Sequence, residues 1–423
     1  MEQPVKRTPL HAWHLSQGAS MADFGGYEMP LWYSSVKNEH LTVLTHAGLF
    51  DTSHMALVDV RGPGAHALLQ RCFTNNLDAC IGKRRKALSS GRCVYGAFLD
   101  ETGGVIDDGI VYKLADDHYL VVVNAGMGAE IASHLTAHQP ALETTVTDMT
   151  DRFGKIDIQG PMAAKILSEV LVDAEKVFDA MPYFSFKGRL DTDCPDERAV
   201  CLKNGTSIVL SRTGYTGEFG FEMFMAADKA VAAWEAIVDA GRPHGLVACG
   251  LAARDSLRGG AVLPLSHQDI GPWPFVHHPW PFALPWTADG TGFSKPFIGD
   301  QALLDVQDPR YTYAFVGSDL RKVSTQDPAI VLNALGEDIG RVLTCVSDMG
   351  IGYVDKQIFS IASPGRPEGF KPRGLCCGFI KVNEKLETGV QVQLIDKRRT
   401  ITVTIVDDIR PDRTARRLIS EMV

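Results

Sequence analysis

Residues 91–125 read GRCVYGAFLDETGGVIDDGIVYKLADDHYLVVVNA, and this stretch decides the class of fold. Three mainly apolar runs are separated by Gly103-Gly104 and by Ala115-Asp116-Asp117. A Gly-Gly pair between two alternating runs is a strong signal for a β-hairpin. The stretch therefore predicts a three-stranded antiparallel meander, and the residues that follow predict a helix near 126–138.

A strand, a Gly-Pro turn and a helix follow one another twice in the chain. The first copy is ALVDVRGPGAHALLQRCF at residues 56–73, and the second is KIDIQGPMAAKILSEVL at residues 155–171. This repeat predicts two similar α+β units. Beyond residue 310, short apolar runs alternate with Gly and Pro turns, which predicts a small β domain.

The composition of the 423 residues, 45% hydrophobic and 22% charged, is that of an ordinary globular protein. This length predicts two or three domains. The net charge of −9 argues against a general nucleic-acid binder, which normally carries a basic surface. The N-terminal residues lack the apolar region of a signal peptide and no long apolar run occurs. We therefore expect a cytoplasmic protein without a membrane span.

The nine cysteines are scattered along the chain, and none of them forms a C-x-x-C pair. An odd and irregular set of this kind is typical of reduced, buried thiols. Structural zinc sites use paired ligand spacings that are missing here, so the sequence predicts no metal site.

The strand VIDDGIVY places Asp107 and Asp108 on opposite faces, because side chains alternate along a strand. Whichever face is the core, one carboxylate is expected in apolar surroundings. Burial raises the pKa of a carboxyl group and favours a role in binding or in moving protons. The alternative is that one aspartate is solvated while the other ends a hairpin, and this fragment alone leaves both interpretations open.

The stretch RTGYTGEFGFEMF at residues 212–224 has a glycine at every third position, at 214, 217 and 220. This spacing indicates a tight excursion of the backbone, and it differs from a dinucleotide-binding fingerprint. Glu222 shares a strand face with Phe224. If that face is buried, the carboxylate needs hydrogen-bond donors, which a heteroaromatic ligand offers. A structural turn followed by an edge-strand glutamate is the other interpretation.

The segment CGLAARDSLRGG predicts a helix that carries Arg254 and Arg258 on one face. Such a pair suits carboxylate recognition and interdomain salt bridges equally well. The next segment, residues 264–286, is rich in proline and tryptophan and contains His267, His277 and His278. A loop of stacked aromatic rings is favoured there over a metal site.

Taken in order, these segments resemble the glycine cleavage T-protein family, which includes aminomethyltransferases and related folate-dependent demethylases. The resemblance covers nearly the whole chain. It is carried by RTPLHAWH (7–14), FGGYEMPLWY (24–33), AGLFDTSHM (47–55), the meander, VVNA (122–125), IQGPMAAKIL (158–167), SRTGYTGEFGFEMF (211–224), CGLAARDSLR (249–258), the Trp286-Thr287 segment and FIGDQALL (297–304).

The resemblance implies an α+β fold with three domains arranged as a cloverleaf around a central tetrahydrofolate site. Residues 1–55 and 145–290 would form a discontinuous first domain, and residues 56–144 a second, related domain. Residues 291–423 would form a C-terminal β-barrel domain.

By the same resemblance, Asp108 is the catalytic residue, beside the folate nitrogens that accept the carbon. Glu222 would accept a hydrogen bond from the amino group of the pterin, and Trp286 would form an aromatic wall. The implied cofactor-binding residues are Met55, Tyr95, Asp108, Val122, Asn124, Tyr215, Glu222, Arg254 and Trp286.

The implied activity is the transfer of a one-carbon unit to or from tetrahydrofolate. The donor would be an aminomethyl group on a lipoyl carrier protein, giving methylenetetrahydrofolate and ammonia. A demethylase or methyltransferase acting on a small methylated compound is the alternative, and a non-catalytic folate-binding regulator is a third. The chain departs from the family at residues 259–262, at 265–267 and in the long aromatic segment that follows, where the donor should approach. These departures put a lipoyl-bearing partner in doubt.

Overall fold

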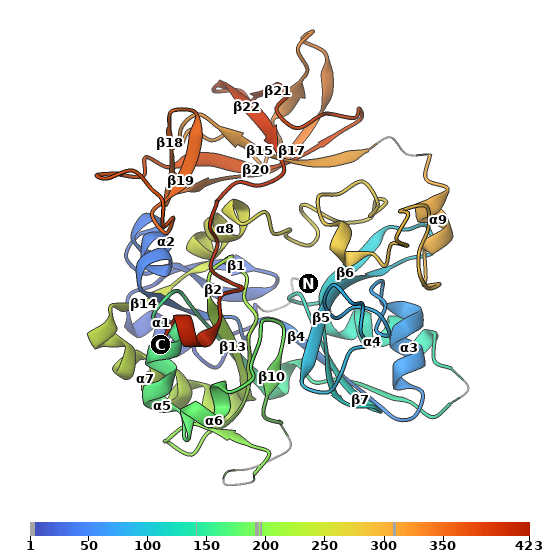
Figure 1. Cartoon of the computed structure of the whole chain (residues 1–423), viewed down its shortest axis with the longest axis vertical. Coiled ribbons are helices and arrows are strands. Elements are labelled where there is room, and N and C mark those ends of the chain that lie inside the picture. Colours follow the sequence, from blue (N-terminus) through green and yellow to red (C-terminus); the bar gives the residue numbers. More distant parts are fainter. Residues whose placement is uncertain (1–4, 141, 191–193, 195–196, 308–309) are drawn as a thin grey trace.

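The computed structural model describes residues 5–423, except for residues 141, 191–193, 195–196 and 308–309. The chain forms three parts, each built around its own β-sheet (Figure 1). In the view of Figure 1, a closed barrel lies above a seven-stranded sheet on the left and a five-stranded sheet on the right. These parts are called the barrel, the seven-stranded unit and the five-stranded unit below.

The five-stranded unit contains the predicted meander, which is confirmed. Its antiparallel strand order is β5-β6-β7-β4-β8. One face of this sheet is covered by two helices, and the other packs against the seven-stranded unit. The elements are β4 (Ala56–Arg61), α3 (Ala65–Cys72), β5 (Arg92–Leu99), β6 (Val105–Ala115), β7 (His118–Val123), α4 (Gly128–Ala137) and β8 (Thr145–Asp148).

The seven-stranded unit is interrupted in sequence by the five-stranded unit. Its strands follow the order β10-β12-β13-β9-β3-β14, and β11 pairs with β12. Its elements are α1 (His11–Ser16), β1 (Ser20–Phe24), β2 (Tyr27–Trp32), α2 (Val36–Thr45), β3 (Ala47–Asp51), β9 (Phe153–Gln159), α5 (Ala163–Val170), α6 (Ala174–Phe178), β10 (Phe186–Lys187), β11 (Val200–Cys201), β12 (Ser207–Ser211), β13 (Gly220–Ala226), α7 (Ala230–Gly241), β14 (Leu246–Cys249) and α8 (Leu251–Gly260).

The repeated strand-turn-helix pattern is present in both units, as β4-α3 and as β9-α5. The glycine of each turn has a positive φ, 112° at Gly62 and 126° at Gly160. At each of these positions a Cβ atom would lie 2.5 Å from a backbone carbonyl oxygen. Only glycine fits such a turn without strain, so the two copies share a backbone requirement as well as a pattern.

The C-terminal part is a closed antiparallel barrel, as expected, with the order β15-β20-β17-β16-β21-β22. A separate hairpin, β18-β19, lies beside it, and α9 precedes it. The elements are α9 (Asp300–Leu304), β15 (Tyr311–Gly317), β16 (Ile330–Leu332), β17 (Asp338–Asp348), β18 (Ile351–Val354), β19 (Gln357–Ser360), β20 (Leu375–Val382), β21 (Gln391–Ile395) and β22 (Thr400–Val406).

The segment after β22 returns from the barrel to the seven-stranded unit. Arg410 is fully buried and donates to Asp348 in β17 at 2.5 Å and to Glu218 at 3.0 Å. Further along the segment, Ile419 packs into the core of the seven-stranded unit. A buried ion pair with both partners satisfied is costly to break, so these contacts hold the barrel against that unit.

The domain boundaries remain a prediction, and the strand pairing bears on one of them. β8 begins at Thr145, where the first domain was expected to resume, yet it pairs with β4 of the five-stranded unit. A division by sheets would therefore place residues 145–148 with residues 56–144.

The expectation that all the cysteines are reduced is wrong for one pair. Cys194 and Cys201 form a disulfide, and their Cα atoms lie 6.1 Å apart, within the range a disulfide spans. The other seven cysteines are free, and all of them except the half-buried Cys80 are buried, as predicted. Among the described residues, none of the helices has both the length and the apolar character that a membrane crossing requires.

Candidate active site

A cavity of about 1410 Å³ lies between the five-stranded unit and the seven-stranded unit. α8 of the seven-stranded unit contributes to the cavity wall, and Arg413 and Arg416 of the returning C-terminal segment line it as well. Eight of the nine predicted cofactor-binding residues line this cavity: Met55, Tyr95, Asp108, Val122, Asn124, Tyr215, Glu222 and Arg254.

Trp286, the ninth, is not among the residues that line this cavity. Its ring instead lies 4.7 Å from the ring of Phe293, across a short β-bridge between the two residues. The sequence placed Trp286 by its position in the motif order alone, which does not fix the direction of a side chain in a loop.

Asp108 presents its carboxylate to the cavity and is held by two neighbours. The Tyr95 hydroxyl donates to Asp108 Oδ2 at 2.7 Å, and the Asn124 amide donates to Asp108 Oδ1 at 2.7 Å. All three residues lie on adjacent strands of the meander, or directly at its end, so the hairpin register brings them together. The two hydrogen bonds fix the orientation of the carboxylate.

Asp107, the neighbour of Asp108 in the strand, is fully buried as well. The Asn124 amide donates to Asp107 Oδ1 at 2.8 Å, and the Asn124 backbone N–H donates to Asp107 Oδ2 at 2.9 Å. The Ser266 hydroxyl also donates to Asp107 Oδ1, at 2.7 Å. The two aspartates therefore share Asn124, and neither is solvated as the alternative interpretation required.

Burial raises the pKa of both carboxyl groups. For Asp107 the neighbouring charge of Asp108 adds to the effect of burial, and its pKa rises to about 7. Hydrogen bonds from Tyr95 and Asn124 oppose the effect of burial on Asp108. Two carboxyl groups this close titrate as a pair, so the pair binds one proton more readily than either group would alone in water.

Glu222 faces the cavity beside Lys155, a buried lysine that was not predicted from the sequence. Lys155 Nζ donates to Glu222 Oε1 and to Asp157 Oδ1, both at 2.6 Å. The Thr213 hydroxyl donates to the other Glu222 oxygen, at 2.5 Å. The signal was present in KIDIQ, where Lys155 and Asp157 share one face of the strand; in the sheet register Asp157 lies opposite Glu222 and Lys155 lies opposite Phe224.

Arg254 and Arg258 have different surroundings, although they share a helix face. Arg254 lines the cavity, donates to Asp157 Oδ2 at 2.8 Å and lies 4.8 Å from the centre of the Tyr215 ring. Arg258 is buried in an ion pair with Asp269 and donates to Thr344 of β17 at 3.0 Å. Arg258 therefore links α8 to the barrel, while Arg254 remains available to an anionic ligand.

The proline- and tryptophan-rich segment packs mainly between the other parts. Trp280 is buried and donates to the Val262 carbonyl at 2.8 Å, and Lys381 of the barrel lies 4.1 Å from the centre of the Trp273 ring. The predicted ring stacking is confirmed, because His277 stacks on Tyr311 and His278 stacks on Trp280.

At the cavity, this segment supplies an edge close to the paired aspartates. Phe282 lines the cavity at this edge, as does Trp280. His267 is half-exposed there, with Nε2 3.7 Å from Asp107 Oδ1. The segment therefore reaches the cavity at residues 264–268 and 279–282 rather than along its whole length.

Comparison with known proteins gives one family. Residues 10–286 match the family model described as the GCVT N-terminal domain. The aminomethyltransferase of Chloroherpeton thalassium is 41% identical over 370 residues, which are 85% of this chain and 93% of that protein. The aminomethyltransferase of Geobacillus sp. (strain WCH70) is 35% identical over 80% of this chain and 86% of its own length.

A solved structure agrees with these matches. The glycine cleavage system aminomethyltransferase T from Bartonella henselae superposes with a TM-score of 0.72 and 25% identity, over 95% of this chain and 97% of that one. The chain therefore belongs to the glycine cleavage T-protein family, the aminomethyltransferases that transfer one-carbon units with tetrahydrofolate.

Proposed function

We propose that this chain transfers the aminomethyl carbon of a lipoyl carrier protein to tetrahydrofolate, with release of ammonia. The observation that carries the proposal is the convergence of eight residues from separate segments on one cavity, with the Asp108 carboxylate in its wall. The relatives named aminomethyltransferase match over most of their own length, which supports the same donor.

The polar groups of the cavity suit a reduced pterin with an anionic tail. Glu222 is a carboxylate acceptor at the cavity wall, and pterin N–H groups are the donors that such an acceptor needs once it is removed from water. Arg254 offers its guanidinium to a carboxylate, stacked over the Tyr215 ring that orients it. We propose that these three residues hold the folate.

When bound, tetrahydrofolate supplies the two nitrogens that take up the carbon. Asp108 stabilises the positive charge that develops on a nitrogen as it gains the carbon, and it accepts a proton from that nitrogen. Tyr95 and Asn124 fix the carboxylate for this task. In balance, the carbon–sulfur and carbon–nitrogen bonds of the donor break, and two new carbon–nitrogen bonds form. The two protons lost from the folate nitrogens end on the sulfur and on the ammonia.

The alternative donor, a small methylated compound, rested on the aromatic segment at residues 264–286. Most of that segment packs against the barrel, and of its tryptophans only Trp280 lines the cavity. The segment therefore gives less support to a small-donor pocket than the sequence suggested.

The test is incubation with tetrahydrofolate and either an aminomethyl-loaded lipoyl carrier protein or a panel of methylated small molecules. The folate product is identified by mass spectrometry. We expect methylenetetrahydrofolate and ammonia with the carrier protein, and loss of both with Asp108→Asn. Methyltetrahydrofolate formed from a small donor would overturn the proposal. So would folate binding without turnover of any donor, as a non-catalytic regulator would show.

A further inference from the structure

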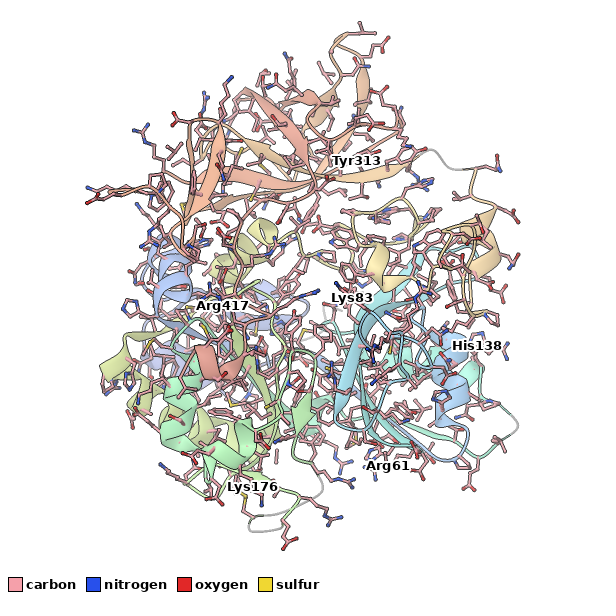
Figure 2. All side chains as sticks on the ribbon, viewed as in Figure 1. Arg61, Lys83, His138, Lys176, Tyr313 and Arg417 are labelled. Carbon is pink, nitrogen blue, oxygen red and sulfur yellow. A yellow bond between two sulfur atoms is a disulfide. The ribbon has the colours of Figure 1, made fainter. Side chains whose placement is uncertain are left out.

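Two helices on the outer side of the five-stranded unit bring together a cysteine and two histidines. α3 ends at Cys72, α4 carries His134, and His138 follows the last turn of α4. These helices cover the face of the sheet that packs away from the seven-stranded unit, at the right of Figure 1. Figure 2 shows His138 at that outer edge of the molecule. None of the three residues lines the folate cavity.

The three side chains offer their ligand atoms to a common point, since one ligand atom from each lies within 4.8 Å of the other two. His138 donates its Nδ1–H to the carbonyl of His134 at 2.8 Å, which leaves the lone pair of its Nε2 free. His134 Nε2 is buried and has no hydrogen-bond partner. A buried polar atom without a partner is costly, and a metal ion would satisfy it.

We propose that Cys72, His134 and His138 form a zinc site that ties α3 to α4. One thiolate and two imidazoles are a ligand set that zinc prefers, whereas calcium and magnesium require oxygen ligands. In a tetrahedral site the ligand atoms lie about 3.3–3.6 Å apart. The ligand atoms, now up to 4.8 Å apart, would therefore approach one another by about 1 Å through rotation of the side chains. On binding, the Cys72 sulfur–hydrogen bond is replaced by a sulfur–zinc bond, the proton leaves to solvent, and water completes the fourth position.

The surroundings are consistent with this assignment. The ring centres of His134 and His138 lie 4.8 Å apart. The ring of Phe98 lies 6.4 Å from that of His134, and Phe98 pairs with Asp107 in the β5-β6 register. A tie between the two helices would thus brace the strands that carry the aspartates from behind.

Sequence spacing alone did not reveal the site. The H-x-x-x-H spacing on a helix places both imidazoles on one face, but the third ligand lies far away in the sequence and is supplied by another helix.

The experiment loads the full chain, first freed of metal by a chelator, with Zn²⁺ or with Co²⁺ as a spectroscopic probe. Metal content, absorption spectra and melting temperature are measured for the unchanged chain and for Cys72→Ser and His138→Gln. Cys80→Ser is the control, because this half-buried thiol lies in the same unit and outside the cluster.

We expect one zinc per chain, a higher melting temperature with zinc, and a thiolate-to-cobalt charge-transfer band. Cys72→Ser should abolish the band. Both cluster variants should weaken zinc binding by more than about 100-fold, since changes to groups that merely orient ligands cost 10–100-fold. The control should behave like the unchanged chain.

The proposal is overturned if zinc binds equally to the unchanged chain and to His138→Gln, a half-buried position whose substitution leaves the helix intact. It is also overturned if no zinc binds at micromolar concentration. A strong blue colour with Cu²⁺ in the absence of zinc uptake would overturn the choice of metal.

Discussion

Replacement of Asp107 by asparagine should make the folding stability of the chain less dependent on pH. The Asp107 carboxyl has a pKa of about 7 in the folded chain, raised from 3.8 by burial and by the charge of Asp108. Asparagine resembles the protonated carboxyl in size and keeps an oxygen that can accept from Ser266 or Asn124. The substitution therefore removes the ionisable group and retains most of the local contacts.

The sign of this pH dependence follows from the difference between the pKa of the Asp107 carboxyl in the folded chain and in the unfolded chain. Below pH 3.8 the carboxyl is protonated in both states, so it contributes nothing. Between pH 3.8 and about 7 it ionises in the unfolded chain only, which favours unfolding, so the stability of the folded chain falls as pH rises. Above about pH 7 the penalty is complete and constant. A shift of about three pKa units corresponds to roughly 4 kcal/mol, of which about 3 kcal/mol develops between pH 5 and pH 8.

The measurement is the free energy of unfolding by denaturant at pH 5 and at pH 8. Relative to the unchanged chain, the free energy of unfolding of Asp107→Asn should rise by about 3 kcal/mol between pH 5 and pH 8. Asp117→Asn, at an exposed position in the β6-β7 turn, is the control and should gain nothing. An Asp107→Asn difference that stays constant across this pH range would refute the reasoning about the aspartate pair.

Asp108→Asn should lower turnover by about 10² or more and weaken folate affinity much less, as separate kinetic and binding measurements would show; equal losses in both would contradict a catalytic role. Glu222→Ala should weaken folate binding by about 1–3 kcal/mol in calorimetry, and an unchanged dissociation constant would show that Glu222 does not hold the pterin. Lys155→Met should lower the free energy of unfolding by about 3–5 kcal/mol, because it leaves two buried carboxylates without their cation, and a neutral effect would argue against a buried ion pair. Trp273→Ala together with Trp280→Ala should lower the melting temperature and alter donor and folate use alike; a selective loss of donor use would revive the small-donor interpretation.

The local pattern of the sequence was sufficient for the meander, the repeated Gly-Pro turns and the barrel, because alternation and turn chemistry act over a few residues. It also indicated that Asp108 and Glu222 would need hydrogen-bond partners if buried, since carboxylates within apolar strands need partners wherever the strands pack, and both are buried and hydrogen-bonded. The motif order then located eight cavity residues without any knowledge of their contacts.

What the sequence did not reveal depends on distant segments meeting. The resemblance named Asp108 alone, whereas in the fold Asn124 and Ser266 also bind Asp107, and Asn124 joins it to its neighbour. Lys155 reaches Glu222 only when β13 pairs with β9, so their ion pair cannot be predicted from either strand alone. The disulfide joins Cys194 to Cys201, seven positions apart in the sequence, and this spacing matches no motif read from the sequence.

The insertion of one sheet into another also bears on how the chain folds. β3 pairs with β9, so Asp51 lies opposite Ile156 across roughly a hundred residues of intervening chain. If those residues stayed unstructured, closing so long a loop would cost about 2 kcal/mol more entropy than closing one of about ten residues. The ends of the inserted unit lie side by side, because Val58 pairs with Asp148. Once the inserted unit has folded, its two ends are held close together, so the effective loop between β3 and β9 is short. The meander should therefore form early, and pairing of β3 with β9 should follow it, which gives the molecule a natural order of assembly.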